Sequence, residues 1–330
     1  MPAQADVLVV GEAGGDGVAR AGSWEALTAA REIADRLAVR VSGLFLGSGI
    51  AETARRWGTA GADRLLIADD ARLQGTLPGP AAAALEQAIA SVEPSVVVVP
   101  GTTAGRDYAP LVAARLDAGL AADCVEFAVE NGALTAVRPV FGGRALTSIR
   151  FPGSRLAMAT VHAGSFAKAE PDLTQPQVET FDVTFTSDDL RVTLLETTPK
   201  GTGVSRLDTA EIVVSGGRGL MEPANFVLVE DLAETLGAAV GATRAVVDAG
   251  WRPHQEQIGQ TGHTVSPRLY VAIGISGAVQ HNVGMQGSDY IVAVNRDPDA
   301  PIFKIASFGI VGDVFEVVPA LTAQIRDAKG

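Results

Sequence analysis

The chain has 330 residues, of which 47% are hydrophobic and 19% are charged, and its formal net charge is −12. This length exceeds what one hydrophobic core usually covers, so two domains are expected. Nucleic-acid binding depends on Lys and Arg side chains that neutralise phosphates, and an acidic chain therefore argues against it. The only cysteine, Cys124, cannot form an intrachain disulfide, which suits a reducing compartment.

The N-terminal segment gives no sign of export. MPAQADVLVVGEAG lacks the basic stretch and the longer apolar stretch of a signal peptide. No apolar run approaches the ~20 residues that a membrane-spanning helix needs. We therefore expect a soluble, cytoplasmic protein.

The first half of the chain alternates between apolar runs and helical patterns. VLVV (7–10) predicts a strand, WEALTAAREIADRL a helix and VSGLFLG a second strand. The alternation continues with a helix in IAETARRWGTAGA, a strand in DRLLIAD, a helix in PAAAALEQAIASVE and a strand in SVVVVPG. Strands without polar alternation are typical of a parallel sheet that helices cover on both faces.

After Asp123 the pattern changes to short alternating segments. LTAVRPVFGGRALTSIRF and RLAMATVHAG predict antiparallel strands added to the first domain. Residues 170–208, rich in Pro, Thr and Asp, predict one or two further strands and then a linker. We therefore expect an N-terminal α/β domain over residues 1–199.

The α/β alternation restarts beyond Lys200. It runs through EIVVSGGRGL, NFVLVEDLAETLGAAVG, LYVAIGI, a helix start at SGAVQHN, DYIVAVN, IFKIASFG and EVVPALTAQI. Residues 200–330 therefore form a second predicted domain. The predicted fold class is α/β, with two doubly wound, Rossmann-like domains, of which the first carries the added antiparallel strands.

Four features that could carry chemistry give weak signals. The glycines of GEAGGDG do not produce the dinucleotide-binding pattern G-x-G-x-x-G in any register. GTTAGRDY lacks the Gly-Lys-Ser/Thr of a phosphate-binding loop, so we expect a helix cap in GTTAGRDY. Cys124 lies in an apolar setting, which favours a buried thiol over a nucleophile. The four histidines lack metal-ligand spacing, and we expect no metal.

In the second predicted domain, polar residues gather where successive apolar strands end. Parallel α/β sheets bind ligands at the carboxyl ends of their strands. Glycines let a ligand approach the backbone, an arginine suits phosphate, and the free N–H groups at a helix start bind anions. Each cluster alone is compatible with a cap or a turn, but their recurrence at strand ends predicts a long ligand with a diphosphate. The residues at these ends are Arg218, Thr243, Arg244, Gln260, Thr261, Ser276, Gly277, Asn295 and Asp313.

From Glu211 to its end, the chain resembles the alpha subunit of electron transfer flavoprotein. The strings SGGRGL, GATRAVVDAGW, IGQTG, GISGAVQH, AVNRDPDAPIF and FGIVGDVFEVVP resemble the FAD-binding signature of that family in order and spacing. The first domain resembles the family more loosely, through VLVV, VVVVPGTTAGRDYAPLVAARL and the strands that follow. His263 and Ser266 depart from it, since the family more often has Lys and Ala there.

The resemblance implies a heterodimer with a beta subunit, which the first domain contacts, and one FAD held chiefly by residues 200–330. Such a protein is an electron carrier rather than an enzyme. It takes electrons from acyl-CoA dehydrogenases of fatty acid beta-oxidation, or from related dehydrogenases, and passes them to a membrane quinone oxidoreductase. The implied FAD-binding residues are Arg218, Thr243, Arg244, Ile258, Gly259, Gln260, Thr261, Ser276, Gly277, Ala278, Val279, Gln280, His281, Asn295 and Asp313.

The resemblance also implies what several of these side chains do. Thr261 would donate a hydrogen bond near N5 of the flavin, Gln260 would hold the ribityl chain or ring edge, and Arg244 would stack on the ring. His281 would donate to the pyrimidine edge, where negative charge collects on reduction. The implied contacts with the diphosphate, ribityl and adenosine groups of FAD come from Arg218, Ser276, Asn295 and Asp313.

Other functions stay open on the sequence alone. One is the alpha subunit of an electron-bifurcating complex whose partner holds a second flavin or AMP. Another is a Rossmann-type flavin or NAD oxidoreductase with its own substrate. Two observations argue against it: the G-x-G-x-x-G pattern is missing, and no proton-transfer pair is evident. A third is a nucleotide-binding regulatory module without redox chemistry.

Overall fold

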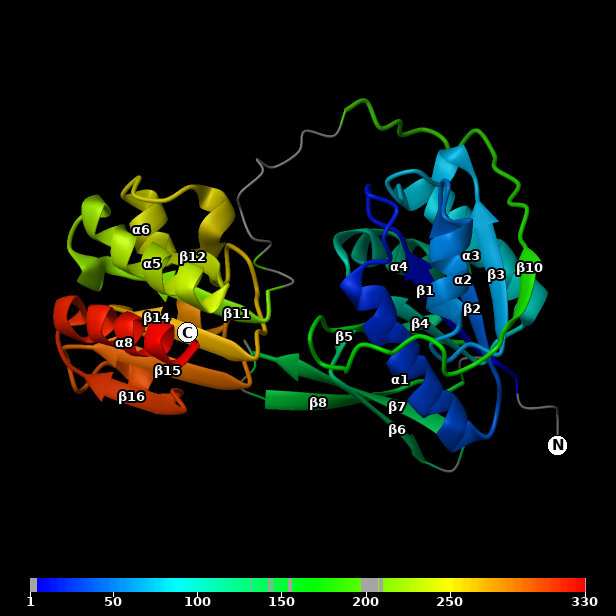
Figure 1. Ribbon diagram of the computed structural model, residues 1–330. Helices are drawn as coiled ribbons and strands as arrows, with labels where there is room; N and C mark the ends of the chain where they lie inside the picture. Colours follow the sequence, from blue (N-terminus) through cyan, green and yellow to red (C-terminus); the bar gives the residue numbers. More distant parts are fainter. Residues whose placement is uncertain are drawn as a thin grey trace. The chain divides into compact units, whose positions relative to one another are not determined.

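The computed structural model describes residues 5–130, 132–141, 143, 145–153, 156–196, 207 and 210–329. It separates into two compact units, Met1–Thr197 and Thr198–Gly330, shown in Figure 1. The boundary that the sequence predicts between residues 199 and 200 lies outside the described residues and stays a prediction.

The first unit is built on a seven-stranded parallel sheet with the order β10-β3-β2-β1-β4-β9-β5. The order reverses between β1 and β4, which is the kind of position where open α/β sheets bind ligands. The strands are β1 (Val7–Glu12), β2 (Val41–Gly47), β3 (Arg64–Asp69), β4 (Val96–Pro100), β5 (Gly119–Cys124), β9 (Ala157–Val161) and β10 (Gln177–Thr180).

Helices cover both faces of this sheet because its central strands are apolar on both sides. Alternate residues of a strand point to opposite faces, so that Val7 and Val9 lie in one core cluster while Leu8 and Val10 lie in the other. On the first face pack α1 (Ala21–Leu37) and α2 (Ala51–Gly58). On the second pack α3 (Pro78–Val92), α4 (Thr103–Arg115) and the 3-10 helix η1 (Ala71–Leu73).

The antiparallel strands predicted after Asp123 are confirmed in part. The strands β6 (Glu126–Glu130), β7 (Ala133–Val140) and β8 (Ala145–Arg150) form a three-stranded antiparallel sheet of their own. The prediction for RLAMATVHAG is wrong, since β9 lies in the parallel sheet between β4 and β5. All five residues of β9 are buried, and a strand covered on both faces is typical of the interior of a parallel sheet.

Where the first sheet reverses its order, its own side chains bond to one another. Glu12 ends β1 fully buried, and its carboxylate accepts hydrogen bonds from Thr102 Oγ1 at 2.7 Å and from the Tyr108 hydroxyl at 2.8 Å. Thr102 also caps α4, because its Oγ1 accepts from the Gly105 N–H at 2.9 Å. The helix cap predicted in GTTAGRDY is therefore confirmed.

Cys124 is buried at the end of β5, as predicted. Burial raises the pKa of its thiol to about 12. Within the part of the chain that the structure describes, no group of three or more His, Cys, Asp or Glu side chains is placed to hold a metal ion. Nor does any helix in these ranges combine the length and hydropathy needed to cross a membrane.

The second unit is built on a six-stranded parallel sheet with the order β13-β12-β11-β14-β15-β16. Its order reverses between β11 and β14. Its strands are β11 (Ile212–Gly216), β12 (Ala239–Thr243), β13 (Gln257–Ile258), β14 (Leu269–Ile273), β15 (Tyr290–Asn295) and β16 (Phe308–Val311). The fold class predicted from the sequence is thereby confirmed.

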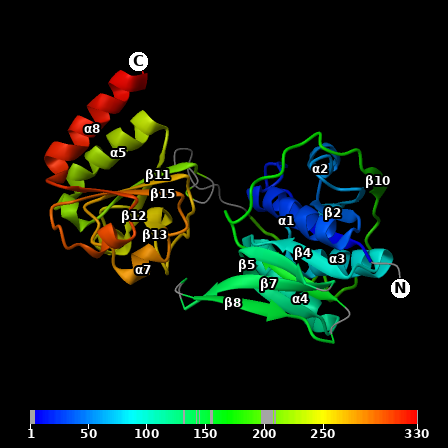
Figure 2. The same ribbon diagram turned by 90° about the horizontal axis from the view of Figure 1, so that it is seen from below.

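The two faces of the second sheet are covered differently. The helices α5 (Val227–Leu236) and α8 (Val314–Lys329) lie side by side on one face, as Figures 1 and 2 show, and Val246 of α6 (Arg244–Asp248) belongs to the same core cluster. The other face packs against loops and short elements. The remaining short elements are α7 (Val279–Asn282), η2 (Arg218–Leu220), η3 (Pro223–Phe226), η4 (His254–Glu256) and η5 (Pro301–Lys304).

Candidate functional site

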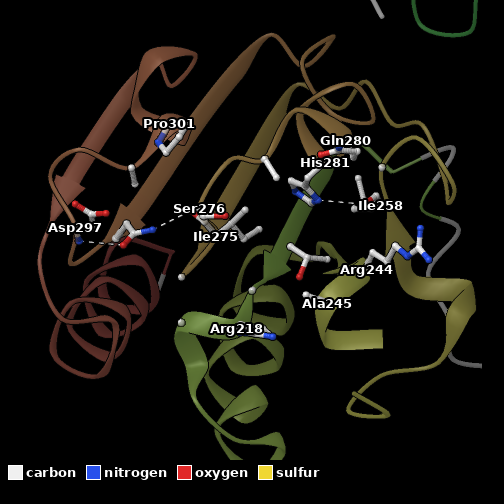
Figure 3. A pocket seen from close by; sticks show the side chains of 18 of the residues that line it. Arg218, Arg244, Ala245, Ile258, Ile275, Ser276, Gln280, His281, Asp297 and Pro301 are labelled. Carbon is white, nitrogen blue, oxygen red and sulfur yellow. Dashed lines mark hydrogen bonds between the residues drawn. The ribbon is translucent and has the colours of Figure 1, made fainter. Parts of the chain in front are cut away.

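A cavity of about 870 Å³ lies at the carboxyl ends of the strands of the second sheet. Its walls come from segments that follow β11, β12, β13, β14, β15 and β16 in turn. Figure 3 shows this arrangement, with Arg218 after β11, Arg244 on α6, and Gln280 and His281 on α7 around one space. Cofactor pockets commonly measure about 300–1,000 Å³, so the cavity has room for a large ligand.

All of the FAD-binding residues implied by the sequence line this cavity, except Gly277 and Val279. Gly277 packs against the backbone of Ile302 instead, and the Val279 side chain is 50% exposed outside the lining. The structure thus brings together residues that are up to 95 positions apart, from Arg218 to Asp313. Contact of each residue with FAD stays a prediction.

The lining also contains residues that the sequence did not single out. Most of them directly neighbour a predicted residue at a strand end, and the string AVNRDPDAPIF already contained four. A systematic choice of the first three or four residues after each strand would have found most of them. They are Gly217, Gly219, Met221, Ala245, Asp248, Gln257, Gly274, Ile275, Arg296, Asp297, Ala300, Pro301, Val314 and Phe315.

Two glycine-rich loops meet at the reversal point of the sheet. The Gly219 N–H donates to the Gly274 carbonyl at 2.9 Å, and the Gly217 N–H donates to the Ile273 carbonyl at 2.8 Å. A Cβ atom on Gly217 would lie 2.4 Å from that Gly274 oxygen, and a Cβ on Gly219 would lie 2.7 Å from Gly274 Cα. Only glycine permits this approach, and the cavity is therefore lined here by main chain.

The helix predicted to start at Ser276 begins later in the structure. α7 is a single turn, Val279–Asn282, preceded by Ala278 with φ −55° and ψ 143°, which lies outside the helical region. Gly277 has φ +83°, which a right-handed helix does not allow, and its missing Cβ makes room for the backbone of Ile302. The predicted helix start at Ser276 is therefore wrong, and contact of this segment with an anionic group stays a prediction. Ser276 is held instead by the Ile302 N–H, which donates to its carbonyl at 3.0 Å.

The loops at the two ends of the LYVAI strand bond to each other. The Gln260 N–H donates to the Gln280 carbonyl at 2.7 Å, and Gly259 packs so closely on Gln280 that a Cβ would lie 2.8 Å from the same oxygen. In the first loop, Gln257 Nε2 donates to Thr261 Oγ1 at 3.1 Å. The two segments thus form one wall of the cavity rather than two independent loops.

His281 is 6% exposed and both of its ring nitrogens are engaged within the protein. Nδ1 lies 3.0 Å from the Ile258 carbonyl oxygen, and Nε2 lies 3.0 Å from the Tyr270 hydroxyl. A carbonyl oxygen only accepts, so Nδ1 carries the hydrogen and Nε2 accepts from Tyr270. Burial lowers the pKa of His281 to about 4, with the bond to Ile258 opposing that shift, and the ring is neutral at pH 7.

This arrangement bears on the role that the resemblance implies for His281. In the structure its one N–H already donates to a protein carbonyl, and its other nitrogen is an acceptor. The neutral ring therefore offers no N–H to the cavity. Donation from His281 to a flavin requires that the ring first turn away from these two partners.

The arginines of the cavity differ in their pairing. Arg244 Nε lies 3.2 Å from Asp248 Oδ2 on the next turn of α6. Arg218 is exposed and forms no ion pair among the described residues. Its guanidinium is therefore free to meet an anionic group, and Arg218 fits the phosphate role implied by the sequence.

Asn295 and Asp313 already have structural contacts at the far end of the cavity. Asn295 Nδ2 donates to the Ile275 carbonyl at 2.9 Å, and its Oδ1 accepts from the Asp297 N–H at 3.0 Å. Asp313 Oδ1 accepts from the Phe315 N–H at 2.9 Å, at the start of α8. Both side chains hold the loops that border the cavity, whatever contact they make with a ligand.

An FAD fits this donor set. The cavity extends across six strand ends, has main-chain glycine walls at the reversal point, and carries an unpaired arginine beside them. A flat ring system, a ribityl chain and a diphosphate need this combination of length, close backbone approach and positive charge.

Comparison with known families decides the identity of the second unit. Residues 7–186 match the electron transfer flavoprotein domain, and residues 206–286 match the electron transfer flavoprotein FAD-binding domain. The chain belongs to the electron transfer flavoprotein alpha-subunit family. The resemblance recognised in the sequence is thereby confirmed, and FAD is the cofactor of this family's C-terminal domain.

Curated relatives agree over almost the whole chain. The electron transfer flavoprotein subunit alpha of Thermoanaerobacterium thermosaccharolyticum is 41% identical, over 92% of this chain and 93% of its own. The FixB protein of Clostridium saccharobutylicum is 43% identical, over 92% of both chains. A protein of Anaerotignum propionicum named acryloyl-CoA reductase electron transfer subunit beta is 36% identical, over 93% of this chain and 92% of its own.

Membership in the electron transfer flavoprotein family indicates an electron carrier rather than a catalytic enzyme. The matched FAD-binding domain contains most of the cavity lining, including Arg218, Arg244, Thr261 and His281. Asn295 and Asp313 lie beyond the matched residues, although they line the same cavity.

Proposed function

We propose that this chain is the FAD-binding alpha subunit of a heterodimeric electron transfer flavoprotein, and that the cavity of the second unit is its FAD site. The observation that carries the proposal is the cavity itself. It lies at the strand ends of the unit that contains the FAD-binding domain, and it is lined by nearly all of the residues that the resemblance implies for FAD.

The protein's part in the redox chemistry is to bind, orient and tune. When bound, FAD accepts and releases the electrons. Arg218 and the glycine loops beside it are proposed to hold the diphosphate, where main-chain N–H groups and a guanidinium both suit phosphate oxygens. Arg244 is proposed to lie against the ring system, where its positive charge favours the reduced form.

The Thr261 hydroxyl group is available as a hydrogen-bond donor. Its hydroxyl oxygen accepts from Gln257 Nε2 at 3.1 Å, and its own hydrogen is therefore left to point elsewhere. Because Thr261 and Gln257 both line the cavity, we propose that this hydrogen donates to the flavin ring. Gln260, whose main chain is bonded to Gln280, is proposed to hold the ribityl chain or the ring edge.

The partners follow from the same proposal. The first unit is proposed to contact a beta subunit, and the chain is proposed to take electrons from acyl-CoA dehydrogenases or related dehydrogenases and to deliver them to a membrane quinone oxidoreductase. An acyl-CoA link is supported by the relative from Anaerotignum propionicum, whose name gives it an electron transfer role in acryloyl-CoA reductase. Phe141, 83% exposed, and Leu146, 64% exposed on β8, provide apolar surface for a protein contact.

Reconstitution with the beta subunit tests the proposal. The two chains are expressed together, purified and saturated with FAD, and flavin is counted from the visible spectrum after release. We expect flavin bound to the alpha–beta complex and reduction of that flavin by an acyl-CoA dehydrogenase with its substrate. A complex that retains no flavin, or a bound flavin that no dehydrogenase reduces, contradicts the cofactor site or the electron-carrier role respectively.

A further inference from the structure

A buried line of three polar side chains extends from the cavity wall into the core of the second unit. His281, on α7, is bonded to Tyr270 on β14. Tyr270 is paired in register with Val213 on β11, and Ser215, two residues further along β11, therefore lies on the same face of the sheet. Tyr270 and Ser215 are both 0% exposed.

Ser215 has a hydroxyl whose oxygen is free to accept. Its Oγ is fully buried and accepts no hydrogen bond among the described residues. Burial raises the pKa of Tyr270, and hydrogen bonding from the Ser215 hydroxyl opposes that rise, so the Ser215 O–H lies where it can donate to the Tyr270 oxygen. A hydroxyl accepts as well as donates, and the Ser215 oxygen therefore has a lone pair that the Tyr270 hydroxyl can meet when it turns.

The present hydrogen-bond directions are fixed by chemistry. His281 Nδ1–H donates to the Ile258 carbonyl, which can only accept. The neutral Nε2 then has a lone pair, and the Tyr270 hydroxyl donates to it. While Tyr270 donates to His281, it cannot donate to Ser215.

We propose that Tyr270 and Ser215 are positioning residues that allow His281 to take up one proton when FAD bound in this cavity is reduced. The inference rests on the proposed function, since it requires FAD in the cavity. It deepens that function by adding two residues that do not line the cavity and by coupling a proton to the electron.

The proton balance uses groups already in place. One proton from water goes to His281 Nε2, which becomes a donor to the Tyr270 oxygen. The Tyr270 hydroxyl turns and donates to the free Ser215 Oγ, while Nδ1–H keeps its bond to Ile258. No covalent bond other than the new N–H forms, and the added positive charge offsets the negative charge of the added electron.

The charged groups around the ring do not themselves bond to it. Within the described residues, both bonds of the His281 ring go to neutral partners, Tyr270 and Ile258. The charged groups that face the same cavity come from η2, α6 and the segments after β15 and β16. Three of them are arginines and three are aspartates, so their formal charges sum to zero. They are Arg218, Arg244, Asp248, Arg296, Asp297 and Asp313.

Histidine NMR on the alpha–beta complex tests the proposal directly. The chain has four histidines, so imidazole ¹⁵N labelling of this subunit gives few signals, and His281→Gln assigns the one that is lost. The FAD-loaded complex is recorded oxidised and after reduction with dithionite, between pH 6 and 9. We expect a neutral ring with hydrogen on Nδ1 in the oxidised complex and hydrogen on both nitrogens at pH 7 in the reduced complex.

Ser215→Ala is the decisive variant because it leaves the resting bonds of His281 intact. It removes only the acceptor that the turned Tyr270 hydroxyl needs, and we expect a proton affinity of His281 in the reduced complex that is about tenfold to a hundredfold lower. Tyr270→Phe, which also removes the bond to Nε2, is expected to lower that affinity and to change the oxidised spectrum. Ser288→Ala, outside the cavity, is the control.

The redox potential gives a second readout. In the wild type, uptake of one proton per electron changes the equilibrium constant for flavin reduction tenfold per pH unit. The redox potential of a one-electron couple then changes by about 59 mV per pH unit. Ser215→Ala is expected to reduce this slope near pH 7. A His281 that stays neutral on reduction, or a Ser215→Ala complex that protonates like the wild type, overturns the inference although FAD binds and is reduced. A complex without flavin overturns the proposed function with it.

Discussion

Gly277→Ala is predicted to damage the FAD site although Gly277 does not line the cavity. Gly277 has φ +83°, and a Cβ added there would lie 2.3 Å from Ile302 N and 2.5 Å from Ile302 Cα. The Ile302 N–H donates to the Ser276 carbonyl at 3.0 Å. An alanine therefore pushes apart the segment that follows β14 and the η5 segment, both of which border the cavity.

The magnitude has two parts. A non-glycine residue in the left-handed region costs about 1–2 kcal/mol. Loss of the bond between Ile302 and Ser276 costs about 0.5–1.5 kcal/mol more. The free energy of unfolding is therefore expected to fall by roughly 1.5–3.5 kcal/mol.

Gly250→Ala is the matched control. Gly250 also has positive φ, +73°, but a Cβ there meets nothing within 4 Å. This variant should show only the cost of the left-handed conformation and should leave FAD affinity unchanged. Chemical denaturation and FAD titration of the alpha–beta complex measure both quantities. If Gly277→Ala costs no more than Gly250→Ala and binds FAD as tightly, the argument from close packing is refuted.

Three further predictions concern single side chains. Arg218→Ala should weaken FAD binding about tenfold, since an exposed charge-assisted contact is lost, and should leave the potential nearly unchanged; an unaltered dissociation constant contradicts this. Thr261→Val should lower the potential of bound FAD by about 20–60 mV, whereas Thr261→Ser should not, as redox titration will show. Cys124 should resist thiol reagents at pH 8 until the protein unfolds, because burial raises its pKa to about 12; rapid labelling of the folded complex contradicts this.

The sequence predicted the elements better than their pairing. VLVV and SVVVVPG read as buried strands because each residue is apolar, and the structure has them as β1 and β4. For RLAMATVHAG, the neighbouring alternating segments favoured an antiparallel strand. The partner of a strand depends on contacts between distant parts of the chain, and β9 pairs in parallel with β4 and β5.

The candidate site was predictable where a residue type and a strand end coincide. Arg218, Asn295 and Asp313 each come at or just after the end of an apolar run, and all three line the cavity. The start of α7 was not predictable, since Ser276 and Gly277 form a common helix-start pair and only the packing of Gly277 on Ile302 excludes a helix there. Ser215 and Tyr270 escaped notice because inside a strand they read as ordinary core residues.

The two sheets share the order of the four strands around their reversal points, β3-β2-β1-β4 and β13-β12-β11-β14. They fill these reversal points differently, and the first residues after each strand account for the difference. In the first unit, β1 ends in Glu12, whose buried carboxylate bonds to Thr102 and Tyr108 and occupies the position with side chains. In the second unit, β11 ends in Gly216 and continues with Gly217, which contribute no side chain. A ligand needs that free space together with donors around it, and both are present at the end of β11.

The burial of the Glu12 carboxyl group is costly, which supports the interpretation that side chains fill the reversal point of the first sheet. Burial raises the pKa of Glu12, and the bonds from Thr102 and Tyr108 oppose that rise only in part. A carboxyl group with a raised pKa in the folded state contributes most to stability below its unfolded pKa and loses that contribution as pH rises through the folded value. A ligand site at the end of β1 would require removing this side chain, whereas the glycines after β11 leave that space free for the proposed FAD.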